Sequence, residues 1–193
     1  MKTDVIVVSS KGTQTEEALN QAEKFAQFKG LDRKKALHLR LLTEEMMGMM
    51  RSITGETEGE FWIEDDTEYA ELHLRVKTII DLETRDQLIA ASTSGKNEAT
   101  RTLMGKLRAF FDIGPVFSAP FMPGESAQVY GAATAWSMQE YRNQLKKYRA
   151  ENGDGAEEEW DELEKSVVSH VADEVKVRVE NNVAEMVIYK WML

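Results

Sequence analysis

The sequence contains no cysteine, and this absence excludes several kinds of chemistry at once. Without thiols the chain can form neither disulfides nor thiolate metal sites, and it has no cysteine nucleophile. A reducing, cytoplasmic compartment is therefore expected. The first residues agree with this, because they lack the apolar length and the small-residue cleavage site of a signal peptide.

Long hydrophobic runs and positive charge are also scarce. No stretch of roughly 18 apolar residues occurs, so the sequence predicts no transmembrane helix and no membrane partner. The 24 Lys and Arg residues are outnumbered by 34 Asp and Glu residues, which gives a net charge of -10. Nucleic-acid binding needs a concentrated positive surface, so no nucleic-acid partner is expected.

Histidine is rare too, and the pattern of possible ligands predicts no metal site. The three histidines, His38, His73 and His170, fall on separate predicted elements without the spacing of zinc ligands. Residues 152–155 read Asn-Gly-Asp-Gly, but the alternate oxygen ligands and closing glutamate of a calcium loop are absent. We interpret this segment as a turn.

Acidic residues are concentrated in one segment. Residues 151–164 carry eight Asp or Glu residues and no Lys or Arg. Such a block is typical of a solvated, flexible stretch, here leading into a helix. The alternative is a docking surface for a basic partner.

The first half of the chain predicts a strand, two helices and a hairpin. The strand covers 4–9, and the helices cover 16–29, capped by Thr15 and ended by Gly30, and 33–53, capped by Asp32. The second helix carries an apolar stripe spaced by three and four residues, namely Leu39, Leu42, Met46, Met49 and Ile53. Strands over 59–64 and 68–78 follow, and the second alternates apolar and polar residues as a half-buried antiparallel hairpin requires.

The second half predicts an insertion followed by a helix and another hairpin. Residues 81–112 are typical of two helical pieces, 113–135 of an ordered loop and 136–149 of a polar helix. A helix over 158–172 precedes valines that alternate with charged residues from 175 to 179. An Asn181-Asn182 turn then leads into a last strand over 183–189, because asparagine tolerates positive φ angles.

This element order predicts an α+β fold in one domain covering 1–193. A two-layer sandwich accommodates it, with a mixed or antiparallel sheet covered by helices on one face. The region of about 82–157 is predicted to be a helical insertion into that domain.

Two regions of the sequence resemble the histidine-kinase-like ATPase fold, in the branch that includes anti-sigma-factor serine kinases. Residues 31–48, ending in Thr-Glu-Glu-Met-Met-Gly, resemble the second helix of that family. Residues 163–190, above all Val-Ala-Asp-Glu-Val-Lys-Val at 171–177, resemble its last helix and closing hairpin. Together they cover about a third of the chain, and the insertion lies where the family has its ATP lid.

The resemblance implies which residues would hold Mg·ATP, and most of them are replaced. Glu44 matches the catalytic base, but Gly48 stands at the position of the Mg²⁺-binding asparagine and has no side chain to offer. Asp81 matches the residue that receives the adenine amino group, without the glycines that follow it in the family. Glu162 and Glu164 stand where phosphate-binding glycines are expected, and carboxylates repel a triphosphate.

Two further segments have alternative interpretations. Lys96 follows Ser94-Gly95, but the glycine and hydroxyl spacing of a phosphate loop is absent, so a helix break with a surface lysine is favoured over a lid contact to phosphate. The methionine cluster at 46–50 suits core packing, and the alternative is a soft apolar pocket.

The sequence therefore predicts a regulatory or adaptor protein on a degenerate ATPase-like scaffold, acting by protein binding through the insertion and the acidic stretch, with no cofactor. One alternative is a divergent ATP-binding protein or serine kinase that uses ATP and Mg²⁺, with Glu44 as base, Asp81 as adenine contact and Lys96 on the phosphates. Another is an unrelated α+β domain for a small apolar ligand. A homodimer is left open.

Overall fold

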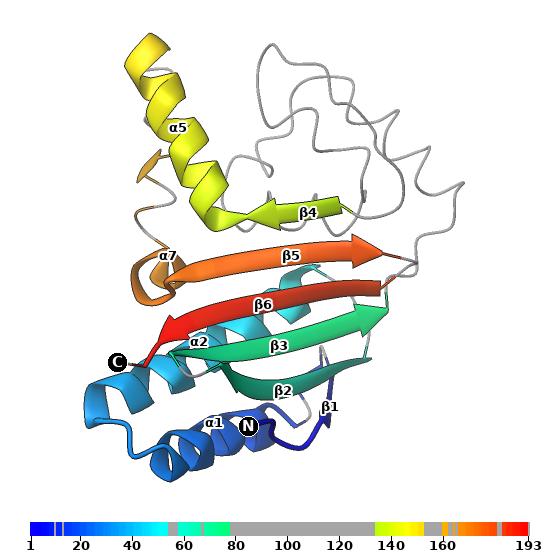
Figure 1. The fold of residues 1–193 in the computed structure, drawn as a ribbon. Helices are drawn as coiled ribbons and strands as arrows, with labels where there is room; N and C mark the ends of the chain where they lie inside the picture. The colour runs from blue at the N-terminus through cyan, green and yellow to red at the C-terminus, as the bar shows by residue number, and fades with distance from the viewer. Residues whose placement is uncertain are drawn as a thin grey trace.

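A computed structural model describes residues 1–9, 11–12, 14–53, 58–66, 68–77, 134–152, 160–161, 164, 166–180 and 183–192. In these residues the chain forms one six-stranded sheet and four helices (Figure 1). The strand order is β1-β2-β3-β6-β5-β4, and each pairing is antiparallel. The predicted α+β class is confirmed, and the described sheet is antiparallel rather than mixed.

The N-terminal elements are β1 (Ile6–Ser9), α1 (Thr15–Phe28) and α2 (Arg33–Ile53). Gly30, with a φ angle of +63°, ends α1 as predicted. The Asp32 side chain accepts a hydrogen bond of 2.8 Å from the Lys35 N–H, which confirms it as the cap of α2. The predicted Thr15 cap is wrong, because Thr15 is already helical and Gln14 precedes it with a left-handed backbone.

Two hairpins form the middle of the sheet. The first joins β2 (Glu58–Asp66) to β3 (Tyr69–Lys77), and the second joins β5 (Glu174–Glu180) to β6 (Val183–Trp191). Both predicted hairpins are confirmed. They meet where β3 pairs with β6, with Leu74 opposite Met186. Segments far apart in the sequence thus lie side by side at the sheet centre (Figure 1).

The remaining described elements are β4 (Thr134–Ser137), α5 (Met138–Asn152) and α7 (Val167–Val171). The sequence assigned the β4 residues to a loop and a helix, and this was wrong because β4 pairs with β5. The helix begins later, at Met138, where the Ser137 hydroxyl accepts a hydrogen bond from the Glu140 N–H at 3.2 Å. The predicted continuous helix over 158–172 is wrong, because Ser166 has an extended backbone and α7 begins only at Val167.

One core cluster joins the helices to the inward-facing side chains of the sheet. Met46, Met47, Met49 and Met50 are all buried in it, so the core-packing interpretation of the methionines is confirmed. The predicted alternation in β3 is confirmed as well. Its buried side belongs to the core, and its other side belongs to what we call the outer face of the sheet, opposite α1 and α2 (Figure 1).

Several predictions lie outside the described residues. They concern the helical pieces over 81–112, most of the loop over 113–135, and most of the acidic stretch. The single-domain organisation with an insertion at about 82–157 therefore stays a prediction. None of the described helices combines the length and the apolar character needed to cross a membrane.

Candidate functional site

The residues predicted to hold ATP are only partly placed by the structure. Glu44 lies exposed on α2, and Gly48 follows one turn later on the same helix. A Cβ added to Gly48 would meet no atom within 4 Å, so packing does not require the glycine there. Asp81 and Lys96 lie outside the described residues, and so does Glu162. Glu164 accepts a hydrogen bond of 2.7 Å from the Trp160 indole N–H.

The outer face of the sheet carries the larger collection of chemically active side chains. Because side chains alternate along a strand, every second residue of β2, β3, β5 and β6 points to this face. These outward-facing residues include Glu60, Trp62, Glu64, Tyr69, Glu71, His73, Arg75, Glu174, Lys176, Arg178, Glu185, Val187, Tyr189 and Trp191.

Trp62 is the centre of the part of this face that lies over β2 and β3. Its ring stacks on His73 with centroids 4.7 Å apart and planes 8° from parallel. Lys2 Nζ and Arg75 Cζ lie 4.5 Å and 5.0 Å from the Trp62 ring centroid. These neighbours leave Trp62 only 3% exposed although no described helix covers this face. Cation–π contacts of this kind stabilise a ring that the outer face would otherwise expose.

Charged partners surround this stack. His73 Nδ1 lies 3.3 Å from Glu185 Oε1, and Nε2 lies 3.3 Å from Glu71 Oε2, although the second contact is not directed as a hydrogen bond. Arg75 lies 3.5 Å from Glu185 and 3.9 Å from Glu60. We call the outer face around Trp62, over β2 and β3, the closed half, because this ring is covered and Glu60 and Glu185 lie near the Arg75 guanidinium.

Glu64 extends the same network to the N-terminal residues. It accepts hydrogen bonds of 2.7 Å from Lys2 Nζ and 2.6 Å from the Trp62 indole. The Lys2 hydrogen bond is the main cause that holds the pKa of Glu64 below its ordinary value, with Trp62 adding to it against partial burial. This carboxylate is therefore fixed in its charged form and is already occupied by partners.

Three aromatic rings gather at one end of the outer face. Tyr69 and Trp191 face each other across β3 and β6 and contact edge to face, with centroids 4.4 Å apart. Tyr189 joins them with its centroid 6.4 Å from that of Tyr69. Trp191 remains 37% exposed. We call Tyr69, Tyr189 and Trp191 the aromatic cluster.

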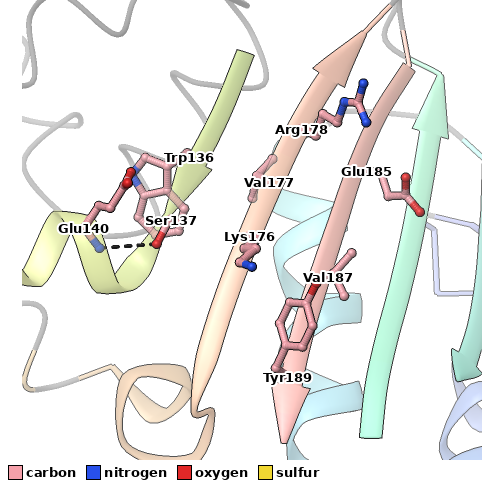
Figure 2. A pocket seen from close by; sticks show the side chains of 9 residues that line it. All are labelled: Trp136, Ser137, Glu140, Lys176, Val177, Arg178, Glu185, Val187 and Tyr189. Carbon is pink, nitrogen blue, oxygen red and sulfur yellow. Dashed lines mark hydrogen bonds between the residues drawn. The ribbon is translucent and has the colours of Figure 1, made fainter. Parts of the chain in front are cut away.

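A pocket of about 370 Å³ lies over β4, β5 and β6 (Figure 2). We call this part of the outer face the open half. The pocket is lined by Trp136, Ser137, Glu140, Lys176, Val177, Arg178, Glu185, Val187 and Tyr189. Figure 2 shows Lys176 and Arg178 on β5 beside Glu185, Val187 and Tyr189 on β6, with Ser137 and Glu140 at the junction of β4 and α5.

Two polar groups of this pocket lack polar partners within the described chain. Lys176 Nζ lies 5.0 Å from the Tyr189 ring centroid but forms no ion pair. The Tyr189 hydroxyl forms no hydrogen bond there. Burial, followed by the negative charges of Glu71, Glu174 and Glu185, raises the pKa of Tyr189. The shift favours the protonated hydroxyl, which can act as a donor.

Glu174, the first residue of β5, accepts three hydrogen bonds. Its carboxylate takes hydrogen bonds from the Ser137 hydroxyl at 3.0 Å, from the Gln139 N–H at 3.2 Å and from the Val175 N–H at 2.8 Å. Ser137 in turn caps α5, so this carboxylate also compensates the first turn of the helix. Glu174 fixes the junction between β4, β5 and α5.

The described residues contain no group of three or more histidine, aspartate or glutamate side chains that could hold a metal ion. His38, His73 and His170 do lie on separate elements, α2, β3 and α7. Comparison with known proteins finds no family model and no curated protein that matches this sequence. The outer face is therefore interpreted from its own chemistry.

Sequence reasoning placed none of the functional candidates on the outer face. Part of the pocket could have been found from the sequence. The alternation in residues 174–191 puts Lys176 and Tyr189 on one side of the hairpin, and the strand register sets Lys176 opposite Val187. The pocket also needs β4, whose four residues follow a Gly- and Ala-rich stretch and carry too little periodicity to identify.

Proposed function

We propose that this chain is a regulatory or adaptor protein that binds another protein through the outer face of its sheet. In this proposal the scaffold is of the histidine-kinase-like ATPase type, with the residues that hold ATP in that family largely replaced. The aromatic cluster carries the proposal. It is a partly exposed group of one Trp and two Tyr rings on a sheet face that no described helix covers.

The composition of the cluster favours protein recognition. Trp and Tyr dominate the binding energy of many protein interfaces, especially where neighbouring groups exclude water around them. Here the charges of Glu71, Lys176 and Glu185 stand close by on the same face. An apolar anchor with a polar surround is the anatomy of a standard interface.

Two observations support a scaffold that does not depend on nucleotide. The described elements include the first strand, the two helices and the two hairpins from which the resemblance was drawn, with β4 as an addition. At Gly48, however, a side chain would fit and none is present, so α2 offers no oxygen ligand at that position. The insertion and acidic stretch, where the sequence placed the interaction surface, lie largely outside the described residues, and their role stays a prediction.

A photo-crosslinking experiment tests the docking face. A benzophenone amino acid replaces Trp191 on the outer face or, as the matched control, Phe28, which is 73% exposed at the end of α1. We expect a discrete crosslinked protein from position 191 in the native cell and none from position 28. The same product from position 28 alone would move the interface to the helices, and a crosslinked dimer from 191 would make the partner a second copy.

The alternative of an ATP-binding protein or serine kinase is favoured by one observation, the exposed position of Glu44 on α2. A thermal shift with ATP or ADP, with and without Mg²⁺, distinguishes the two functions. Ligand at 100 times its dissociation constant stabilises by about 2.7 kcal/mol, and each kcal/mol raises the midpoint by roughly 2–4 °C at this size. A Mg²⁺-dependent rise abolished by Asp81→Ala would establish nucleotide binding and contradict our proposal.

A further inference from the structure

We propose that the pocket of the open half binds a small organic carboxylate with an apolar body. The inference rests on the lining of the pocket and does not depend on the docking of a protein partner. At about 370 Å³ the pocket falls in the range of small-molecule sites, which combine apolar walls with a few polar groups.

The apolar part of the ligand would lie against β6. Val187 and the Tyr189 ring belong to the same face of that strand, and the Lys176 side chain lies across them from β5. Val187 stands directly opposite Lys176 in the strand register. A ligand that covers Val187 and Tyr189 therefore removes apolar surface from water, the main source of affinity for small ligands.

The polar part of the ligand would be recognised by Lys176 and Tyr189. The Lys176 ammonium has no ion pair and the Tyr189 hydroxyl has no hydrogen bond in the described chain. Both residues line the pocket, and an ammonium and a phenolic hydroxyl are both hydrogen-bond donors. A carboxylate accepts from an ammonium and a hydroxyl at once, and charge-assisted hydrogen bonds of this kind are the strong ones.

The remaining charges select for a single negative charge. Glu185 is paired with His73 and Arg75, and Glu174 is held by three donors, so neither neutralises Lys176. Glu140 and Glu185 nevertheless line the pocket and repel a second negative charge, whereas Arg178, the other cation of the lining, is already engaged in an interaction of its own. The first turn of α5 is already capped and offers no phosphate site. Phosphates and nucleotides are therefore poor ligands here.

The test is a titration of the full chain, labelled with ¹⁵N, by nuclear magnetic resonance. The probes are 3-phenylpropionate, its neutral amide and inorganic phosphate, each up to about 10 mM to reach millimolar affinities. We expect saturable shifts of the β5 and β6 amide signals with the carboxylate, binding about tenfold weaker with the amide, and no saturation with phosphate.

Variants assign the contacts. Lys176→Met keeps the apolar stem and should weaken carboxylate binding about tenfold. Val187→Phe should abolish it by filling the pocket. Lys146→Met, on the exposed side of α5, is the matched control and should change nothing. The proposal is overturned if no carboxylate shift saturates, if the amide binds equally well, or if Lys176→Met binds as tightly as the unaltered protein.

Discussion

The two halves of the outer face belong to one sheet but differ in how far their polar and aromatic side chains are occupied by neighbouring groups. In the closed half, Trp62 is covered by His73, Lys2 and Arg75, and the surrounding carboxylates have cationic partners. In the open half, Lys176 and the Tyr189 hydroxyl border a pocket and have no polar partner among the residues that the structure describes. The boundary between the halves runs along Glu185, which lines the pocket and pairs with His73 and Arg75.

This difference suggests separate roles for the two halves, folding stability for the closed half and ligand binding for the open half. A set of groups that satisfy one another leaves nothing for a ligand and contributes to the folded state. Groups without partners add little to stability and are available for recognition. The closed half should therefore respond to substitution through the free energy of unfolding, and the open half through the affinity for a ligand.

The largest expected effect compares two tryptophans. Trp62→Ala removes a ring that is 3% exposed and should lower the free energy of unfolding by about 3–5 kcal/mol. Trp191→Ala removes a ring that is 37% exposed and should cost less than about 1 kcal/mol. Urea denaturation of both variants measures the difference. Equal losses would show that the closed half is not the more structural of the two.

A second comparison sets a lysine in an ion pair against Lys176, which contacts the Tyr189 ring but forms no ion pair with the described residues. Lys29 at the end of α1 forms an ion pair with Asp65, whose side chain is 8% exposed. Lys29→Met should cost about 1–3 kcal/mol at neutral pH because a buried carboxylate loses a partner. Lys176→Met should change stability by less than about 0.5 kcal/mol. If both variants were neutral, ion pairing would not distinguish the two positions.

The same pair predicts a pH dependence. Burial raises the pKa of Asp65, but hydrogen bonds and charges from Lys29 and the Met1 amino group outweigh it, so the pKa is lowered. A lowered pKa gives stability that is complete above the ordinary value of 3.8 and is lost as the pH falls through the folded pKa. Lys29→Met should therefore shift acid unfolding, followed by circular dichroism, to higher pH.

The smallest expected effect concerns Tyr189. Its raised pKa means that the folded state holds the phenolic proton more tightly, so stability falls as the pH rises from the ordinary value of 10.0 through the folded pKa. Tyr189→Phe should remove that part of the alkaline loss and leave stability at neutral pH within about 0.5 kcal/mol. Urea midpoints measured across this range give the result, and an unchanged alkaline slope would contradict it.

Local signals in the sequence were enough for most elements of the fold. The Asp32 cap and the glycine at position 30 mark helix ends by their own chemistry, and the alternation through Leu72, Leu74 and Val76 identifies a half-buried strand. These features depend on neighbours in sequence, which is why they could be predicted.

Features that depend on distant partners could not be predicted in this way. β4 is recognisable only through its pairing with β5, and the antiparallel direction of the whole sheet depends on how the two hairpins meet. The pocket combines three strands and the start of α5. The sequence gives the positions and spacing of the candidate ATP-binding residues. Their arrangement in space depends on segments that lie far from α2 in the sequence.

The pairing of β3 with β6, which we call the seam, has a consequence for how the chain folds. Each hairpin has its paired residues close in sequence, Asp66 with Tyr69 and Glu180 with Val183, and such units form within about 1–10 μs. Joining Lys77 to Val183 instead closes a loop that spans residues 78–182, which is entropically costly and slow. The His73–Glu185 and Arg75–Glu185 contacts cross this seam, so they form late, and we expect loss of Glu185 to accelerate unfolding more than it slows folding.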